Sequence, residues 1–280
     1  MTTQLERADR FRALHDPAAP LALANAWDGA SARLVAASGA AAIATTSAGV
    51  AWGLGAADGN RVDRTAALAL LERVVGAVEL PVTADIESGF GAAPTDVADT
   101  VARVLAIGAV GVNIEDAHPE PAPGDPLRPA GEQAERLAAA RAAAERAGIP
   151  LYLNARIDVF LYGAGEPSGR LAETLRRAAI YLDAGASGVF VPGVADPELI
   201  AELAAGIEAP LNILVGPGSP SIAELGKLGV ARASLGSAVA EAAYALVDRA
   251  ARELLATGTY ESVREAMDFQ RLNSLMKSGE

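Results

Sequence analysis

Residues 82–91 read VTADIESGFG, a short apolar strand that runs directly into two carboxylates, Asp85 and Glu87. Residues 110–115 repeat this arrangement and end on Glu115. Outward from these two segments, short β-branched stretches alternate with Ala/Leu/Arg/Glu stretches of helical period, which is typical of βα units in a parallel sheet. The sequence predicts eight strands, at 21–25, 41–46, 82–85, 110–115, 151–156, 188–191, 211–215 and 232–234. Eight strands favour closure into an α/β fold of the (β/α)8 TIM barrel type.

Helices are expected between the strands, at 28–38, 63–78, 94–107, 131–147, 170–184, 196–205, 219–228 and 237–256. Pro94 suits a first helical turn, and Gly108 and Gly148 lie where C-caps are needed. An open doubly wound sheet is the alternative, but no Gly-x-Gly-x-x-Gly turn follows the first strand to bind a dinucleotide. We expect one domain over residues 1–280. Residues 257–280 form an extra C-terminal helical segment, which packs on its own barrel or on a neighbouring subunit.

Charge and composition exclude several classes of partner. The 280 residues include 23 Lys and Arg against 35 Asp and Glu, and the formal net charge is −12. Such a surface repels nucleic acid phosphates and anionic lipids. The chain is 51% hydrophobic but has no apolar run of transmembrane length, and residues 1–15 are too polar for a secretory signal. We therefore expect a cytoplasmic homo-oligomer, a dimer or a tetramer, that binds neither nucleic acid nor membrane.

The residue types that are scarce narrow the chemistry further. The chain has no cysteine, which excludes disulfides and thiolate catalysis. Its lysines are Lys227 and Lys277, and its histidines are His15 and His118. A Schiff-base enzyme or a histidine-rich zinc site is therefore not expected.

The strongest functional signal is the set of carboxylates at the ends of the third and fourth predicted strands. Active sites of barrel enzymes lie at the C-terminal ends of the strands, and alternation along a strand points Asp85 and Glu87 the same way. Together with Glu115 they would repel one another in a site of low dielectric constant unless a cation lay among them. Oxygen ligands favour Mg²⁺, or Mn²⁺, over zinc. The alternative is that these acids cap helices or pair with surface arginines.

Arg156 ends the fifth predicted strand in an apolar setting, where a guanidinium needs a partner. It either clamps a substrate carboxylate or forms a structural salt bridge to Asp158 or Glu115. The segment at 47–49, after the second strand, is equally open to two interpretations. It either offers backbone N–H groups to an anionic ligand or forms an ordinary turn.

Six segments carry a resemblance to a known family. They are 25–28 (NAWD), 46–50 (TSAGV), 54–59 (LGAADG), 85–91 (DIESGFG), 111–116 (GVNIED) and 154–156 (NAR). In order and spacing, over roughly residues 20–240, they resemble the isocitrate lyase / phosphoenolpyruvate mutase superfamily. The resemblance implies a Mg²⁺-dependent barrel that cleaves or rearranges C–C or P–C bonds next to an enolate in 2-oxo carboxylates or their precursors.

The resemblance also implies roles for individual residues. Metal binding, directly or through water, falls to Asp85, Glu87 and Glu115, with Asp58 nearby. Substrate binding falls to Trp27, Ser47, Ala48, Gly49, Asp85 and Arg156. A metal and an arginine at a 2-oxo acid would stabilise the negative charge that develops on an enolate oxygen.

The chain departs from the family pattern in the loop after the fourth strand. Members that cleave isocitrate or methylisocitrate carry a Lys-Lys/Arg-Cys-Gly-His loop whose cysteine is the acid/base, and phosphoenolpyruvate mutases carry a Lys and an Asn. Residues 116–128 here read DAHPEPAPGDPLR, without Cys, Lys or Asn. His118 is the candidate replacement as a general acid or base on a mobile loop, and the alternative is a solvated histidine.

Two further departures concern the site itself. Val191, Pro192 and Gly193 stand where relatives place a His or a Glu that contacts substrate. In addition, Glu87 replaces the more usual second Asp, and its extra methylene shifts the metal or displaces a bridging water.

Three functions compete on these grounds. The first is a Mg²⁺-dependent lyase or decarboxylase that acts on a small 2-oxo or 2-hydroxy dicarboxylate through a metal-stabilised enolate. The second is a phosphoenolpyruvate/phosphonopyruvate mutase or hydrolase. The third is a 2-oxo acid binding protein with little turnover.

Overall fold

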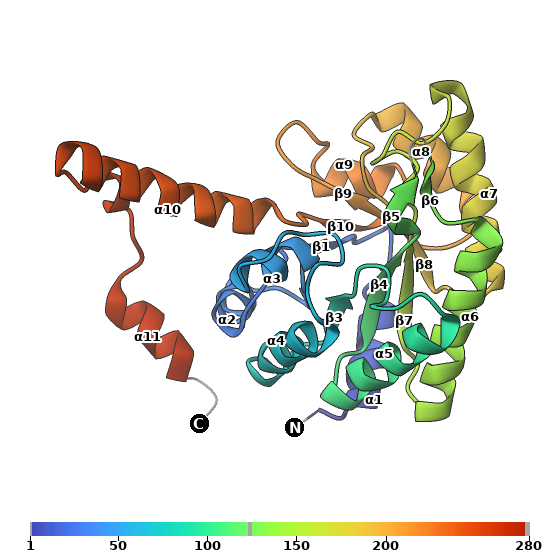
Figure 1. Ribbon diagram of the computed structural model, residues 1–280, viewed down its shortest axis with the longest axis horizontal. Coiled ribbons are helices and arrows are strands. Elements are labelled where there is room, and N and C mark those ends of the chain that lie inside the picture. Colours follow the sequence, from blue (N-terminus) through green and yellow to red (C-terminus); the bar gives the residue numbers. More distant parts are fainter. Residues whose placement is uncertain (1, 123–124, 278–280) are drawn as a thin grey trace.

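The computed structural model describes residues 2–122 and 125–277, and in it all eight predicted strands pair in one parallel sheet (Figure 1). The strand order is β1-β10-β9-β8-β7-β4-β3-β2. A bridge between Ala26 and Thr45 joins the two outer strands, so the sheet closes into a barrel. The strands are β1 (Leu21–Leu23), β2 (Ile43–Ala44), β3 (Val82–Asp85), β4 (Gly111–Glu115), β7 (Tyr152–Arg156), β8 (Gly188–Val191), β9 (Leu211–Leu214) and β10 (Val230–Ser234).

The eight predicted helices are also present, with ends that differ from the prediction by a few residues. Local chemistry fixes several of them, as the Asp63 side chain accepts hydrogen bonds from the first turn of α4 and Pro94 opens α5. Gly108 and Gly148 cap α5 and α6 with positive φ. The helices are α2 (Gly29–Ala37), α4 (Arg64–Gly76), α5 (Pro94–Ile107), α6 (Ala130–Ala147), α7 (Arg170–Asp183), α8 (Pro197–Gly206), α9 (Ile222–Lys227) and α10 (Ala238–Thr257).

Several elements escaped the prediction because their patterns are short or polar. They are α1 (Gln4–Ala13), α3 (Ser47–Gly53), α11 (Phe269–Lys277) in part, the 3₁₀ turns η1 (Pro167–Gly169) and η2 (Glu261–Val263), and the antiparallel pair of β5 (Ala117–Ala122) and β6 (Asp125–Leu127). This β5–β6 hairpin lies within the 116–128 loop, where the sequence departs from the pattern of the resembled family. Residues 47–49 are therefore neither an isolated turn nor an open loop, because they form the first turn of α3.

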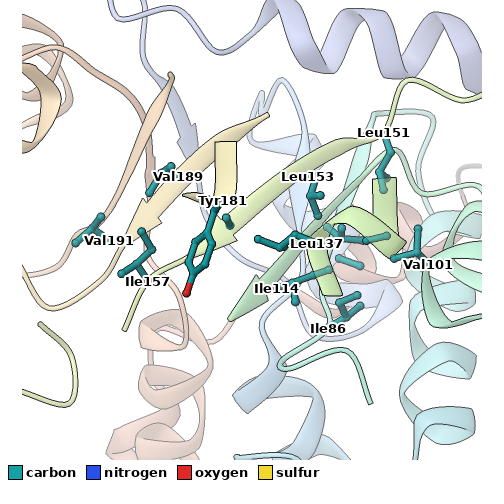
Figure 2. Close-up of a cluster of buried hydrophobic side chains, with 14 of the residues drawn as sticks. Ile86, Val101, Ile114, Leu137, Leu151, Leu153, Ile157, Tyr181, Val189 and Val191 are labelled. Atoms are coloured by element: carbon teal, nitrogen blue, oxygen red, sulfur yellow. The ribbon is translucent and has the colours of Figure 1, made fainter. Parts of the chain in front are cut away.

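The main hydrophobic core lies between the sheet and the surrounding helices. Figure 2 shows part of it, where Ile114 and Leu153 of neighbouring strands face Leu137 of α6. These side chains are at most 2% exposed, and burying each one stabilises the fold by about 1.5–3 kcal/mol. The core holds the strand ends of the C-terminal mouth in a fixed frame.

A second, smaller cluster closes the N-terminal end of the barrel. Phe11 of α1 is fully buried and meets the ring of Tyr152 edge-on at 5.6 Å, while His15 stacks on Tyr152 at 3.7 Å. Phe11 comes so close to β4 that a Cβ on Gly111 would lie 2.8 Å from its ring. Helix α1 thus covers this mouth and leaves the opposite one for ligands.

The C-terminal helices behave differently from the others. In Figure 1, α10 runs away from the barrel, and the chain then returns through α11 toward α2. The Arg33 guanidinium donates to the Leu275 carbonyl at 3.0 Å where α11 meets α2. None of the helices in the described part of the chain has the length and apolar character needed to span a bilayer.

Candidate active site

Strand register brings the predicted site residues to one level of the C-terminal mouth. Asp85 of β3 pairs with Asn113 of β4, and Glu115 of β4 pairs with Arg156 of β7. Because parallel strands end at the same edge, three consecutive strands of the sheet contribute the acids and the arginine. The sequence placed these residues at strand ends, and the sheet order makes them neighbours.

Arg156 forms both of the salt bridges that the sequence left open. Its Nη1 lies 2.9 Å from Glu115 Oε2, and its Nε lies 2.7 Å from Asp158 Oδ1. Burial raises the pKa of Glu115, whereas the Arg156 guanidinium acts in the opposite direction. Burial likewise raises the pKa of Asp158, to about 6. Arg156 therefore has a fixed orientation at the mouth before any ligand arrives.

Asp85 is held by backbone and hydroxyl groups. Its Oδ2 accepts the Ser47 backbone N–H at 3.2 Å, and its own N–H donates to Thr45 Oγ1 at 2.8 Å. The first turn of α3 therefore does present an N–H group to a negative charge, and that charge is a carboxylate of the protein.

Glu87 lies in a strained loop directly after β3. Its φ is +51°, in the left-handed region that a non-glycine residue rarely adopts. Its carboxylate accepts the Asn60 backbone N–H. Burial, followed by the charges of Asp85 and Asp58, raises the pKa of Glu87 to about 7, although the Asn60 contact opposes this shift. The surrounding structure holds Glu87 in this strained conformation, and its side chain is buried.

The glycines after Glu87 are required by the conformation and packing of the loop itself. Gly89 has a φ of +92°, and a Cβ on Gly91 would lie 2.2 Å from the Asp96 Cβ. The side chain of Asp96 occupies that space when it caps α5 through the Ala93 N–H. Below the loop, the fully buried Arg136 donates to the carbonyls of Ser88, Gly91 and Ala92.

The remaining predicted contacts lie around this cluster. Asp58 is at its exposed rim, and desolvation and the Asp85 charge raise its pKa. Trp27 is half-buried, and a Cβ on Gly49 would lie 2.8 Å from the Trp27 Cβ. Ser47 and Ala48 are buried at the start of α3. The glycine in the turn is thus needed for close packing against the tryptophan.

The donor chemistry of the cluster fits a hard divalent cation. Asp58, Glu87 and Glu115 each have a raised pKa, to which the charge of Asp85 contributes, so a cation would relieve their repulsion. The arrangement is not preassembled. Among the side chains that the structure describes, no three of the His, Asp and Glu residues are grouped to hold a metal ion. Arg156 and backbone amides contact the carboxylates instead.

His118 lies beside the cluster and not within the contacts described above. It is half-buried and lines a cavity of about 710 Å³ together with Asn60, Ser88 and Arg128. Its neighbours in the predicted loop, 119–125, lie outside the side chains that the structure describes.

Several residues of the site were not singled out from the sequence as functional. Asn60 and Asp158 hold Glu87 and Arg156, and Asp158 has the spacing of two that places it on the same side as Arg156. Tyr162 follows Asp158 at the mouth, where its backbone N–H donates to the Asp158 carbonyl at 3.0 Å, and burial and then Glu115 raise its pKa. No local pattern marks Asn60 or Tyr162.

The chain is similar to several known proteins. A family model described as phosphoenolpyruvate phosphomutase matches residues 11–255. An uncharacterised protein of Mycobacterium tuberculosis is 40% identical over 228 residues, 81% of each chain. A 2-methylisocitrate lyase of Halalkalibacterium halodurans is 29% identical over 213 residues, 75% of this chain and 67% of the lyase.

A solved structure from Burkholderia cenocepacia, named a putative phosphonomutase, is 45% identical with a TM-score of 0.83, and the match covers 87% of this chain and 98% of that one. The superfamily to which such proteins belong contains lyases, mutases and hydrolases of small carboxylates. The match to the family model spans most of the chain, and the chain therefore belongs to the phosphoenolpyruvate phosphomutase family, within the PEP mutase/isocitrate lyase superfamily.

Proposed function

We propose that this protein is a Mg²⁺-dependent carbon–carbon lyase or decarboxylase that acts on a small 2-oxo or 2-hydroxy dicarboxylate, with Mn²⁺ as an alternative ion. One observation carries the proposal: at the open mouth of the barrel Glu115 lies 2.9 Å from the oriented Arg156, and Asp58, Asp85 and Glu87 lie near enough for their charges to affect one another. An excess of negative charge of this kind beside one guanidinium would be stabilised by a bound cation.

The residues of the chain divide into two tasks. Asp85, Glu87 and Glu115, with Asp58 at the rim, would hold the metal. Arg156 would bind a substrate carboxylate, because its Nε and Nη1 are fixed by two acids while the rest of the planar guanidinium remains for a ligand. Ser47, Ala48, Gly49 and Trp27 would form the adjoining wall.

The reaction needs little more than charge stabilisation. In a decarboxylation the C–C bond to the leaving carboxylate breaks, carbon dioxide departs, and the electron pair remains on the substrate as an enolate that then takes a proton. When bound, Mg²⁺ would offset the negative charge on the 2-oxo oxygen. Arg156 would hold the second carboxylate in place. Such a reaction does not need the loop cysteine that isocitrate-cleaving members of the superfamily carry.

The metal proposal is tested by binding. We expect wild type to bind Mn²⁺, followed by electron paramagnetic resonance, and the Asp85→Ala/Glu115→Ala variant to lose that binding by about 100-fold or more. Asp63→Ala is the matched control, since Asp63 caps α4 near the mouth. Equal binding by wild type and the double variant would show that the metal assignment is wrong.

The reaction is tested with a panel of 2-oxo and 2-hydroxy acids, with and without Mg²⁺. Mg²⁺-dependent loss of oxaloacetate absorbance that disappears in Asp85→Ala is the expected result. Saturable binding without any product would instead identify a 2-oxo acid binding protein.

His118 as a general acid or base is a further part of the proposal. It lies on the β5 strand of the hairpin and faces the cavity next to Glu87, so movement of the hairpin would bring it over the mouth. The pH–rate profile of His118→Ala should lose one limb. An unchanged profile rules this role out.

Carbon–phosphorus chemistry is the second candidate. The matching family model and the name of the 45% identical relative support it. Phosphorus NMR that detects conversion of phosphonopyruvate would favour a mutase or hydrolase over the lyase.

We further propose that the chain is a homo-oligomer, a dimer or a tetramer, in which the segment 257–280 and α10 contact a neighbouring subunit. Val247 and Leu255 of α10 are 64% and 86% exposed, which is unusual for side chains of this kind unless a partner covers them. Sedimentation velocity should show one assembly for wild type and a smaller species for Leu255→Glu. One domain and a cytoplasmic location remain predictions from the sequence.

A further inference from the structure

A buried polar network lies directly beside the candidate site. Asp116 follows Glu115 at the end of β4 and is fully buried. Its Oδ2 accepts hydrogen bonds from the Tyr181 hydroxyl at 2.8 Å and from Arg177 Nη1 at 2.9 Å. Tyr181 and Arg177 both belong to α7, so Asp116 joins β4 to the helix after β7. We call these three residues the Asp116 network.

The network holds both ends of the β5–β6 hairpin. The Asp116 carbonyl accepts the Arg128 backbone N–H at 2.8 Å, and Arg177 Nη1 donates to the Arg128 carbonyl at 2.9 Å. Asp116 precedes the hairpin and Arg128 follows it. The two ends of the hairpin are therefore joined through the Asp116 backbone and through Arg177, which also contacts the Asp116 carboxylate.

The same carboxylate also fixes the segment that carries the arginine of the site. Asp116 Oδ1 accepts the Asp158 backbone N–H at 2.9 Å, and the Asp116 N–H donates to the Arg156 carbonyl at 3.1 Å. The Asp158 side chain in turn holds Arg156 Nε. A shift of Asp116 would reach the Arg156 guanidinium through two short contacts.

The network is costly as a purely structural device. Burial raises the pKa of Asp116, against the hydrogen bonds and the Arg177 charge that lower it. Apolar residues of similar volume would pack at least as well as a buried ion pair. Figure 2 shows Tyr181 among Ile157, Val189 and Val191. Its hydroxyl is the polar group in this apolar cluster. Hydrogen bonds fix the direction of neighbouring groups, and this accounts for Asp116, Arg177 and Tyr181 better than packing alone.

We propose that Asp116, Arg177 and Tyr181 are positioning residues that keep the hairpin base and the Arg156 guanidinium in a fixed mutual geometry, so that carboxylate binding and hairpin placement are coupled. This inference rests on the proposed function in taking Arg156 as the carboxylate-binding group. It adds three residues, none of which touches the ligand.

The test uses Tyr181→Phe, which removes one hydroxyl and keeps the ring. The probe is oxalate, a small dicarboxylate, with Mg²⁺ present. Oxalate affinity, measured by calorimetry, should fall about tenfold. The variant loses a strong hydrogen bond to the charged Asp116, and Asp116 then holds Asp158 and Arg156 less firmly. Mn²⁺ affinity should stay within about twofold, since the acids keep their places.

Amide exchange supplies a readout that does not depend on any ligand. The Arg128 and Asp158 amides both donate to Asp116. In Tyr181→Phe their exchange should accelerate about tenfold together. Arg177→Lys should retain more oxalate affinity than Arg177→Met, because it keeps the charge beside Asp116.

Tyr152→Phe is the matched control, since Tyr152 is an equally buried tyrosine at the other end of the barrel. If both tyrosine variants change oxalate affinity and amide exchange equally, the positioning role is wrong. If wild type binds neither Mn²⁺ nor oxalate, the proposed function fails instead, and exchange of the two amides still decides whether the network holds both segments.

Discussion

The two ends of the barrel each contain a buried arginine, and the two arginines differ in their contacts with acids. At the C-terminal mouth, Arg156 lies between the Glu115 and Asp158 carboxylates. At the other end, Arg232 of β10 is fully buried, its Nη2 lies 3.4 Å from Asn113 Oδ1, and its guanidinium lies 6.0 Å from the Phe11 ring. Within the described residues its Nε and Nη1 have no hydrogen-bond partner.

The contrast concerns the charge state of the two arginines. Burial lowers the pKa of Arg232 to about 10, whereas the neighbouring acids raise the pKa of Arg156. The mouth keeps its arginine charged among acids and open to ligands. The opposite end is closed by α1 and an aromatic stack. Under the proposed function, charge at the mouth serves binding, and packing at the other end serves stability.

Arg156→Met should produce the largest effect. Glu115 and Asp158 would remain buried without their counter-charge, and breaking a buried pair in this way costs about 3–5 kcal/mol of unfolding free energy. Urea denaturation at pH 8, where these acids must be charged when unfolded, measures this loss. A free energy of unfolding equal to that of wild type would contradict the role of Arg156 as the partner of both acids.

Acid should change the contributions of the two ends to folding stability in opposite directions. Burial lowers the pKa of His15 from 6.5 to about 3, so the unfolded state binds more protons and stability falls as the pH drops below 6.5. The raised pKa values of Glu87 and Asp158 act the other way, and those residues favour the folded state as the pH drops. His15→Gln isolates the first effect. The stability advantage of wild type over the variant should shrink by about 2 kcal/mol from pH 7 to pH 5.

Stability against urea at several pH values measures this difference. A constant difference between wild type and His15→Gln would show that His15 titrates normally in the folded protein. Its Nδ1 donates to the Phe11 carbonyl at 2.8 Å, and Arg232 adds to the burial effect on its pKa.

Asp196→Ala should have a smaller effect on stability. It tests whether an acid at the mouth end but outside the acidic cluster affects ligand binding. Asp196 caps α8 by accepting the Leu199 N–H at 2.9 Å, and it lies at the mouth end of the barrel. Loss of an N-cap costs about 1 kcal/mol. Thermal denaturation should register this loss while oxalate and Mn²⁺ affinities stay at wild-type values. A loss of oxalate affinity would mean that the mouth extends further than the acidic cluster.

Arg232→Met should have the smallest effect on stability. Its guanidinium lacks a carboxylate contact among the described residues, and a methionine of similar length fits an apolar setting. We expect a free energy of unfolding that is unchanged or higher by less than about 1 kcal/mol. A loss comparable to that of Arg156→Met would remove the distinction between the two ends.

The sequence by itself determined the elements of the barrel and the chemistry at its mouth. Strand and helix periods are local, so eight strands, eight helices and the placing of Asp85, Glu115 and Arg156 at strand ends could all be predicted. Elements without such a period, α1, α3 and the β5–β6 hairpin, could not. The constraint on Gly91, which is the Asp96 side chain, is a packing contact that no local pattern reveals.

Only the tertiary structure decided which groups touch. Arg156 pairs with Glu115 of the neighbouring strand. The Asn60 N–H, in a loop after α3, donates to Glu87, and the Tyr181 hydroxyl donates to Asp116, 65 residues earlier in the chain. Each contact depends on closure of the barrel, which fixes distances between segments that no local pattern relates. The sequence names the donors and acceptors, and the closed sheet determines their partners.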